Sequence, residues 1–189
     1  MDLQLSDEDL KEICQDEQRR EQFLEQLIDA YSQSVLWLAY TYVKEKPLAE
    51  EITQDVFLTS YNKLTMFKNH SSIKTWIYRI TINKCKDQLR KKTIKRFLMN
   101  DEQSLDDYHV TLTHPESIAI QTFEDQQLAN RVMSLPNKYK DVIYMHYFED
   151  MKIKEIGEVL HLKENTIKSR LNRGRDLLRT LYEEGLDEH

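Results

Sequence analysis

The chain has few residues of the kinds that make turns, cross-links or membrane spans. Of its 189 residues, only three are glycine, three are proline and two are cysteine. A shortage of glycine and proline favours long helices, because these residues most often interrupt them. No run approaches the roughly 20 uncharged apolar residues that a membrane-spanning helix needs. Since 40% of the residues are hydrophobic, the chain can still build a core.

The sequence also lacks the signals of secretion and of common enzyme classes. Its start, MDLQLSDEDL, is acidic rather than basic, so it is not a secretory signal. Cys14 and Cys85 lie far apart and have no partner at metal-ligand spacing, so we expect reduced thiols and a cytoplasmic protein. There is no phosphate-binding glycine loop, no HExxH pair and no nucleophile in a recognisable setting. We therefore predict no catalytic residue, no metal site and no cofactor.

The net charge of −6 is distributed unevenly. Residues 1–31 carry ten acidic and three basic residues, and residues 97–130 carry seven acidic residues and no Lys or Arg. Two segments, 84–96 and 163–179, are strongly basic instead. Local charge determines the field that a phosphate meets within about a Debye length (~10 Å). Either basic segment alone could be a solvated helix face, but two of them on amphipathic patterns favour binding to nucleic acid.

Apolar periodicity predicts helices throughout the first half of the chain. We expect one over residues 7–28, a second over 35–43, and a third with Pro47 in its first turn, where no N–H is needed. The stretch MFKNHSS (66–72) predicts a loop, and a fourth helix follows it. That helix has an apolar stripe for the core: Ile73, Trp76, Ile77 and Ile80. Trp76 could stack on a base, but its place on the stripe favours core packing.

The second half begins after an acidic, aperiodic segment that ends in a proline, residues 99–115, which predicts a linker. Helical periodicity resumes near residue 116. The expected fold is therefore all-α, with two small helical domains at residues 1–96 and 118–189, joined by an acidic linker at 97–117. This linker could be a simple tether.

The segment 150–185 predicts a helix-turn-helix. A short apolar helix pattern, Ile153 to Leu160, is followed by a turn and a longer helix, and Gly157 would suit the close approach of the two. Apolar or small residues recur in the longer helix at spacings of four, three, four and three: Ile167, Leu171, Gly174, Leu178 and Leu181. Basic and short polar side chains lie on the outward side of this helix or toward its flanks: Asn165, Lys168, Ser169, Asn172, Arg173 and Arg175. Such a face can hold phosphates and read base edges, although two helices of any bundle can mimic the pattern.

Three segments resemble the extracytoplasmic-function (ECF) sigma factors of the sigma-70 superfamily. Residues 134–179, above all TIKSRLNRGRDLLR, resemble the domain that binds the promoter −35 element. LAEEITQDVFLTSYNKL (48–64) resembles the polymerase-binding helix, and SSIKTWIYRITINKCKDQLRKK (71–92) resembles the −10-element helix. The resemblance spans roughly residues 20–96 and 120–182 in the family's order.

The resemblance implies an alternative sigma factor that binds core RNA polymerase, recognises the −10 and −35 elements and promotes strand opening. The implied contacts with the clamp of the polymerase β′ subunit are Glu51, Gln54, Asp55 and Leu58. The implied −10 contacts, to duplex and single-stranded DNA, are Asn69, His70, Ser71, Lys74, Arg79, Asn83, Lys86 and Arg90. The implied −35 contacts are Thr166, Lys168, Ser169, Arg170, Asn172 and Arg173.

Family members are commonly held inactive by an anti-sigma factor, often membrane-anchored, so the resemblance implies such a partner too. The family's linker threads toward the RNA exit path. Lys152 and Lys163 depart from the family by replacing helix-capping Ser or Thr, so Glu155 keeps half of a capping box. His161 replaces the turn glycine and would need a left-handed conformation. The alternative is an autonomous helix-turn-helix regulator whose N-terminal domain senses or dimerises.

Overall fold

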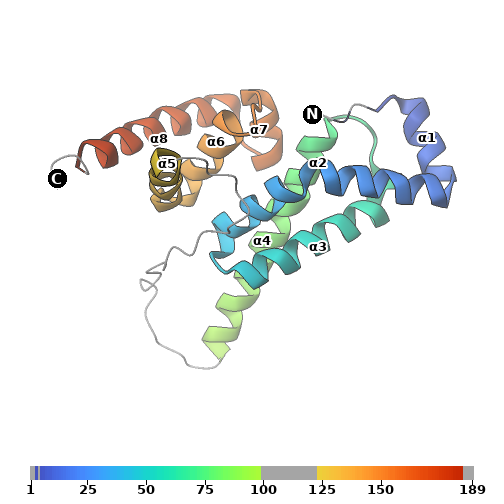
Figure 1. The fold of residues 1–189 in the computed structure, drawn as a ribbon, viewed down its shortest axis with the longest axis horizontal. Coiled ribbons are helices and arrows are strands. Elements are labelled where there is room, and N and C mark those ends of the chain that lie inside the picture. Colours follow the sequence, from blue (N-terminus) through green and yellow to red (C-terminus); the bar gives the residue numbers. More distant parts are fainter. Residues whose placement is uncertain (1–2, 4, 99–122, 185–189) are drawn as a thin grey trace. The chain divides into compact units, whose positions relative to one another are not determined.

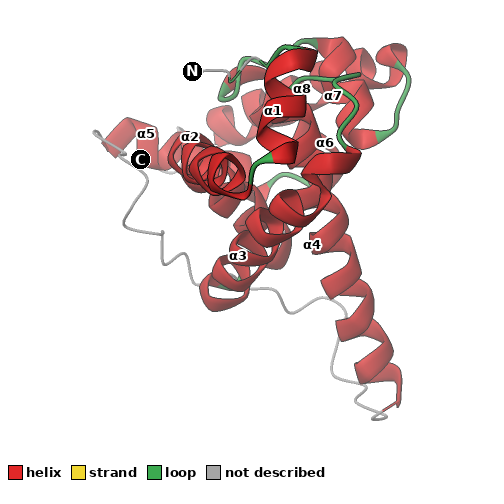
Figure 2. Ribbon diagram, turned by 90° about the vertical axis from the view of Figure 1, so that its right-hand side faces the viewer, coloured by secondary structure: helices red, strands yellow, loops and turns green. Residues whose placement is uncertain are grey.

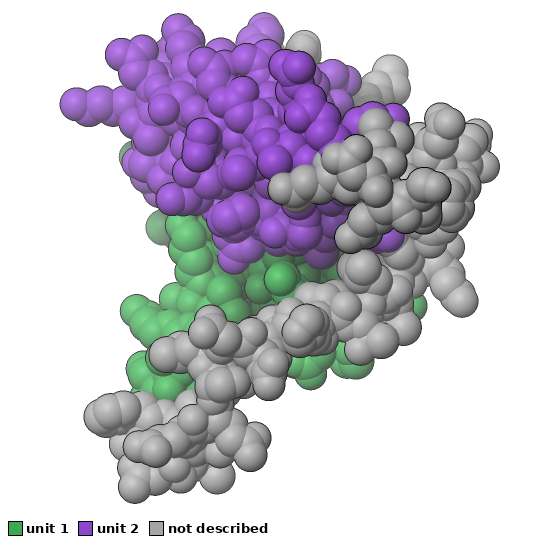
Figure 3. All heavy atoms as spheres, turned by 90° about the vertical axis from the view of Figure 1, so that its left-hand side faces the viewer, with its two compact units in different colours: residues 1–115 green, residues 116–189 purple. Residues whose placement is uncertain are grey.

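The chain divides into two compact units, residues 1–115 and residues 116–189 (Figure 3). A computed structural model describes residue 3, residues 5–98 and residues 123–184. Within those ranges all regular structure is helical and no strand occurs (Figure 2), which confirms the all-α prediction. None of these helices combines the length and apolarity that crossing a bilayer requires.

The first unit is built from four α-helices and one turn of 3-10 helix (Figure 1). They are α1 (Asp7–Gln15), α2 (Glu17–Val43), α3 (Lys46–Lys63), η1 (Leu64–Met66) and α4 (Ile73–Leu98). Helices α2, α3 and α4 pack against one another, and α1 packs against α2. Buried residues from all three large helices form the core, among them Leu27, Val35, Leu38, Ile52, Val56, Ile77 and Ile82.

The N-terminal helices differ from the prediction of one helix over residues 7–28 and another over 35–43. The first helix ends before Asp16, which is extended and accepts a hydrogen bond from the Gln18 N–H at 2.8 Å. A residue that caps a new helix in this way must itself leave the old one. The next helix then runs without the predicted gap, because buried Tyr31 continues the apolar stripe.

Helices α3 and α4 begin as predicted. Pro47 lies in the first turn of α3. The Ser72 hydroxyl accepts a hydrogen bond from the Thr75 N–H at 3.1 Å, which supports the start of α4 directly after the predicted loop. Helix α4 extends to Leu98, so the first two residues of the predicted linker are helical, whereas residues 99–117 lie outside the described ranges.

The core face of α4 is rotated slightly from the predicted stripe. Ile73 and Ile77 are buried as expected, but Ile80 is only half-buried. Tyr78 and Ile82 are fully buried instead, because α4 packs against both α2 and α3 and needs a wider apolar face than one stripe supplies.

The second unit contains four helices. They are α5 (Phe123–Ser134), α6 (Asn137–Tyr147), α7 (Ile153–Leu160) and α8 (Glu164–Glu184). Helix α8 packs against α5, α6 and α7, and its Ile167 is fully buried. A Cβ added to Gly174 would lie 2.9 Å from Ile143 Cγ1, so the absence of a side chain allows α6 and α8 to approach closely.

The turn between α7 and α8 has the predicted helix-turn-helix geometry. His161 ends α7 in the left-handed conformation, with φ 56° and ψ 46°, as expected for the residue that replaces a turn glycine. The Leu162 N–H donates to the Gly157 carbonyl at 2.9 Å. A Cβ on Gly157 would lie 2.8 Å from the Leu162 carbonyl oxygen, so the close approach is between this turn and α7. The Glu155 carboxylate accepts from the Lys152 N–H at 2.8 Å, which is the retained half of the capping box.

Candidate nucleic-acid and polymerase interfaces

The outward face of α8 collects the residues predicted to contact the −35 element. Buried Ile167 and Leu171 hold the opposite face of the helix against the core. Four of the predicted residues are exposed, Lys168, Ser169, Asn172 and Arg173, and two are half-buried, Thr166 and Arg170. One helix side therefore presents cationic and hydrogen-bonding side chains to solvent, which suits a major groove.

Most basic side chains on this face form no ion pair with a carboxylate of the described residues. Within the described part of the chain, no ion pair involves Lys168, Arg170 or Arg173. The carbonyl oxygen of the Asn172 side chain accepts a hydrogen bond from the Arg175 guanidinium. That bond orients the amide of Asn172 and keeps its two N–H hydrogens available as donors.

The four residues predicted to bind polymerase lie on α3. Glu51 and Gln54 are exposed and Asp55 is half-buried, while the core residues Ile52 and Val56 secure the other side of the helix. Leu58 is 58% exposed, one helical turn beyond Gln54. An acidic face with an apolar side chain beside it suits a partner helix that is basic and partly apolar.

The predicted −10 residues on α4 face away from the core to different degrees. Asn83, Lys86 and Arg90 are exposed, whereas Lys74 and Arg79 are half-buried. Arg79 keeps its Nε buried without a hydrogen-bond partner among the described residues. Arg90 is 3.2 Å from the Asp87 carboxylate in an exposed pair, which a phosphate can displace at little cost because such pairs are weak.

The loop between η1 and α4 is held at both ends and at its tip. At one end Phe67 is buried and its ring lies 5.0 Å from that of Trp76, centroid to centroid. At the tip Asn69 has φ 54° and its side chain contacts the N-terminal segment. His70 is exposed and Ser71 is half-exposed, so both remain accessible.

Trp76 satisfies only part of the prediction of core packing. It is half-buried and packs on Phe67 at the base of the loop. It therefore supports the loop rather than filling the centre of the helical bundle.

One contact of a candidate site residue has no signal in the sequence pattern. The Lys84 ammonium on α4 lies 3.3 Å from the Asp55 carboxylate on α3. Both residues line a groove of about 440 Å³ between the two helices, together with Ile52, Thr59, Lys63, Asp87, Gln88, Arg90 and Lys91. Lys84 was noted only as part of a basic segment, because no periodicity within α4 reveals a contact with α3.

Comparison with protein families finds both halves of the chain. Residues 27–94 match the model of sigma-70 region 2, and residues 125–178 match the model of sigma-70 region 4. The first match contains the α3 and α4 faces, and the second contains α7 and most of α8.

Individual proteins are similar over most of the chain. The RNA polymerase sigma factor SigV of Bacillus subtilis is 31% identical over 152 residues, covering 80% of this chain and 86% of that protein. The ECF RNA polymerase sigma factor SigW of the same organism is 29% identical over 159 residues, covering 81% and 85%. Among solved structures, the sigma factor RpoE of Bartonella quintana, determined with the anti-sigma factor NepR, is similar with a TM-score of 0.70 at 19% identity, covering 84% of this chain and 96% of that one.

Proposed function

Because the chain belongs to the ECF group of the sigma-70 family of RNA polymerase sigma factors, we propose a specific division of work among its helices. As a member of this family it is an alternative sigma factor, a transcription-initiation protein without catalytic chemistry of its own. The proposal concerns which of its residues bind polymerase and which bind promoter DNA.

Helix α3 is the polymerase-docking face. Glu51, Gln54, Asp55 and Leu58 bind the clamp of the β′ subunit. Support comes from the combination of exposed acidic and polar groups with an apolar side chain, Leu58, that is 58% exposed. An unpartnered leucine beside acids is typical of a surface that another protein covers.

The loop at residues 67–72 and helix α4 bind the −10 element. Asn69, His70 and Ser71 hold an unstacked base, which small polar side chains can recognise by hydrogen bonds. Lys74, Arg79, Asn83, Lys86 and Arg90 follow the strand along α4, with cations for phosphates and the Asn83 amide for polar contacts. Holding the displaced single strand is what favours strand opening, and this step needs no catalytic group.

Helix α8 reads the −35 element from the major groove. Lys168, Arg170 and Arg173 bind phosphates or guanine edges, while Thr166, Ser169 and Asn172 hydrogen-bond to base edges. The observation that carries the whole proposal is this face on the second helix of a helix-turn-helix, where Lys168, Arg170 and Arg173 form no ion pair among the described residues.

The proposal also places the protein in the cytoplasm, where polymerase and chromosomal promoters are. An anti-sigma factor, of the soluble or the membrane-anchored kind, is a further proposed partner. Support comes from the structurally similar sigma factor RpoE, which was solved with the anti-sigma factor NepR.

Run-off transcription with bacterial core polymerase and pooled promoter fragments tests the proposal. We expect discrete transcripts that require the protein and disappear in a Gln54→Ala/Asp55→Ala variant. A Glu25→Gln variant is the matched control, because Glu25 is an exposed acid on α2 and not on the proposed face of α3. Tight binding of duplex DNA by the protein alone, without any association with core polymerase, would instead favour an autonomous helix-turn-helix regulator.

A further inference from the structure

The loop at residues 67–72 is in contact with the N-terminal segment. The Asn69 side-chain amide donates hydrogen bonds to the Leu5 carbonyl at 2.9 Å and to the Asp7 carboxylate at 3.1 Å. An asparagine amide has only two hydrogens to donate. While both bonds hold, Asn69 has no donor left for a base.

The N-terminal segment, residues 5–15, is otherwise held by the packing of α1 on α2 and by the exposed Glu12–Arg19 ion pair. The Leu3 N–H donates to the Tyr31 hydroxyl at 3.2 Å, and Leu10 is its one buried side chain among those described. Helix α1 has nine residues, which is too short to be stable without packing. The segment can therefore detach without disturbing the core formed by α2, α3 and α4.

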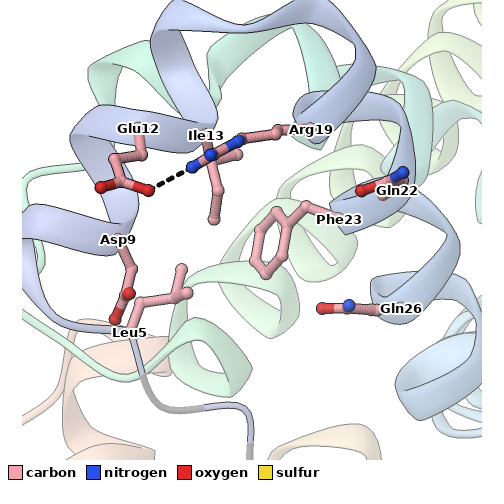
Figure 4. A pocket seen from close by; sticks show the side chains of 8 residues that line it. All are labelled: Leu5, Asp9, Glu12, Ile13, Arg19, Gln22, Phe23 and Gln26. Atoms are coloured by element: carbon pink, nitrogen blue, oxygen red, sulfur yellow. Dashed lines mark hydrogen bonds and ion pairs between the residues drawn. The ribbon is translucent and has the colours of Figure 1, made fainter.

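A groove open to solvent lies between α1 and α2. It encloses about 350 Å³ and is lined by the apolar residues Leu5, Ile13 and Phe23 with polar and charged side chains around them. Figure 4 shows Phe23 and Ile13 at this groove, with the Glu12–Arg19 ion pair along one side. The polar and charged side chains of the groove stay exposed to water, so this part of the contact between α1 and α2 adds little apolar burial.

The segment is also strongly acidic. The carboxylates of α1 are Asp7, Glu8, Asp9 and Glu12, against the single base Lys11. Hydrogen bonds from the Ser6 side chain and backbone lower the pKa of the Asp9 carboxyl, so it stays ionised. A single-stranded nucleic acid is polyanionic, and the segment and such a strand repel each other at the loop.

We propose that residues 5–15 form an intramolecular latch that occupies Asn69 in the free protein and is displaced when single-stranded DNA enters the loop. This inference rests on the proposed role of the loop and adds a regulatory step to it. The latch makes strand capture in the free protein weak, because each binding event must first break the Asn69–Leu5 and Asn69–Asp7 hydrogen bonds.

The latch can be tested with the free full-length chain and a fluorescein-labelled single-stranded DNA 20-mer of random sequence. In Asp7→Ala the latch loses its charged acceptor, so we expect the dissociation constant to fall about three- to ten-fold, the scale of one solvent-exposed hydrogen bond. Glu8→Ala is the matched control. Glu8 is an exposed acid in the same first turn of α1, and it forms no hydrogen bond or ion pair with the loop among the described residues. The Glu8→Ala variant therefore measures only the charge repulsion between the segment and the DNA.

An Asn69→Ala background separates the hydrogen bond from the charge. There, Asp7→Ala should change affinity only as much as Glu8→Ala does, because the bond is already absent. Equal effects of Asp7→Ala and Glu8→Ala in the native background would overturn the latch, and so would binding too weak to measure in every variant. Weaker binding by Asp7→Ala would overturn it as well, since the segment would then support the loop instead of blocking it.

The proposed function and the latch fail in different experiments. Absence of association with core polymerase contradicts the proposed function and leaves the DNA titrations of the free chain to decide on the latch. A protein that directs transcription normally but shows no specific effect of Asp7→Ala retains the proposed function and has no latch.

Discussion

The Asp55 carboxylate on α3 and the Lys84 ammonium on α4 form an ion pair at 3.3 Å. Asp55 lies on the proposed polymerase-docking face, and Lys84 lies on the helix proposed to follow the promoter strand. Both side chains are partly exposed, at 47% and 32% respectively. A protein cation that binds Asp55 therefore competes with Lys84 and leaves it available to a phosphate.

The ion pair leads to a prediction about polymerase affinity. Asp55→Asn should raise the dissociation constant for core polymerase about ten-fold, the scale of one charged hydrogen bond. Lys84→Ala should change it less than about three-fold, because an exposed pair contributes only ~0.2–1 kcal/mol. Titration of labelled protein with core polymerase measures both. If Glu25→Gln on α2 weakens binding as much as Asp55→Asn, net charge rather than this face determines affinity.

The face of α8 predicts two kinds of loss on promoter DNA. Lys168→Ala should weaken binding to all promoter fragments alike and reduce the slope of log affinity against log salt by about one. Asn172→Ala should instead cost ~1–3 kcal/mol on the preferred sequence and relax specificity at one position. Titrations of the polymerase holoenzyme with matched and single-base-changed promoter fragments at several salt concentrations distinguish them.

Arg179→Ala serves as the control for those titrations. Arg179 lies further along α8 and is paired with Glu183 at 2.9 Å, so its loss should leave specificity unchanged. A change in base preference in this variant would argue against readout by the N-terminal half of α8.

Replacing Gly157 by alanine should have a large effect on stability, although it adds only one methyl group. In Gly157→Ala the new Cβ would lie 2.8 Å from the Leu162 carbonyl oxygen, and a backbone atom cannot move aside as a flexible side chain can. We expect the free energy of unfolding of the second unit to fall by about 1–3 kcal/mol, as for other overpacked sites. Thermal denaturation followed by circular dichroism measures this. A Tm equal to that of the native protein would mean that the turn adjusts freely.

Replacing His161 by glycine should stabilise the second unit. Its left-handed backbone costs a residue with a Cβ roughly 1–2 kcal/mol, and glycine avoids most of that cost. His161→Gly should therefore raise the Tm of the second unit. His161→Ala keeps the Cβ, so its Tm should stay near that of the native protein. Equal Tm values for the glycine and alanine variants would show that the backbone there is not strained.

Much of the fold could be predicted because its signals are local. Pro47, the loop before Ile73 and the left-handed His161 each depend on residues within one or two turns of themselves. The break at Asp16 was missed because an aspartate within an amphipathic pattern fits a helix face as well as a cap, and only the backbone distinguishes the two.

The candidate site was predictable in part for the same reason. Periodicity and resemblance identified the exposed faces of α3, α4 and α8. They gave no signal for the contact of Asn69 with Leu5 or for the pair of Asp55 and Lys84, which join residues 64 and 29 positions apart. Such contacts depend on how helices pack, which the pattern within one helix does not encode.

The packing of Trp76 on Phe67 gives the protein a built-in optical reporter. The chain has two tryptophans, Trp37 and Trp76, and both belong to the first unit. Trp37 is 9% exposed on α2, whereas Trp76 is half-buried at the base of the loop. In a Trp37→Phe variant the remaining indole emission comes from Trp76 at the loop. Stopped-flow fluorescence then measures the rate at which the loop binds a strand, without any attached dye. Helix α8 contains no tryptophan and adds no indole emission of its own.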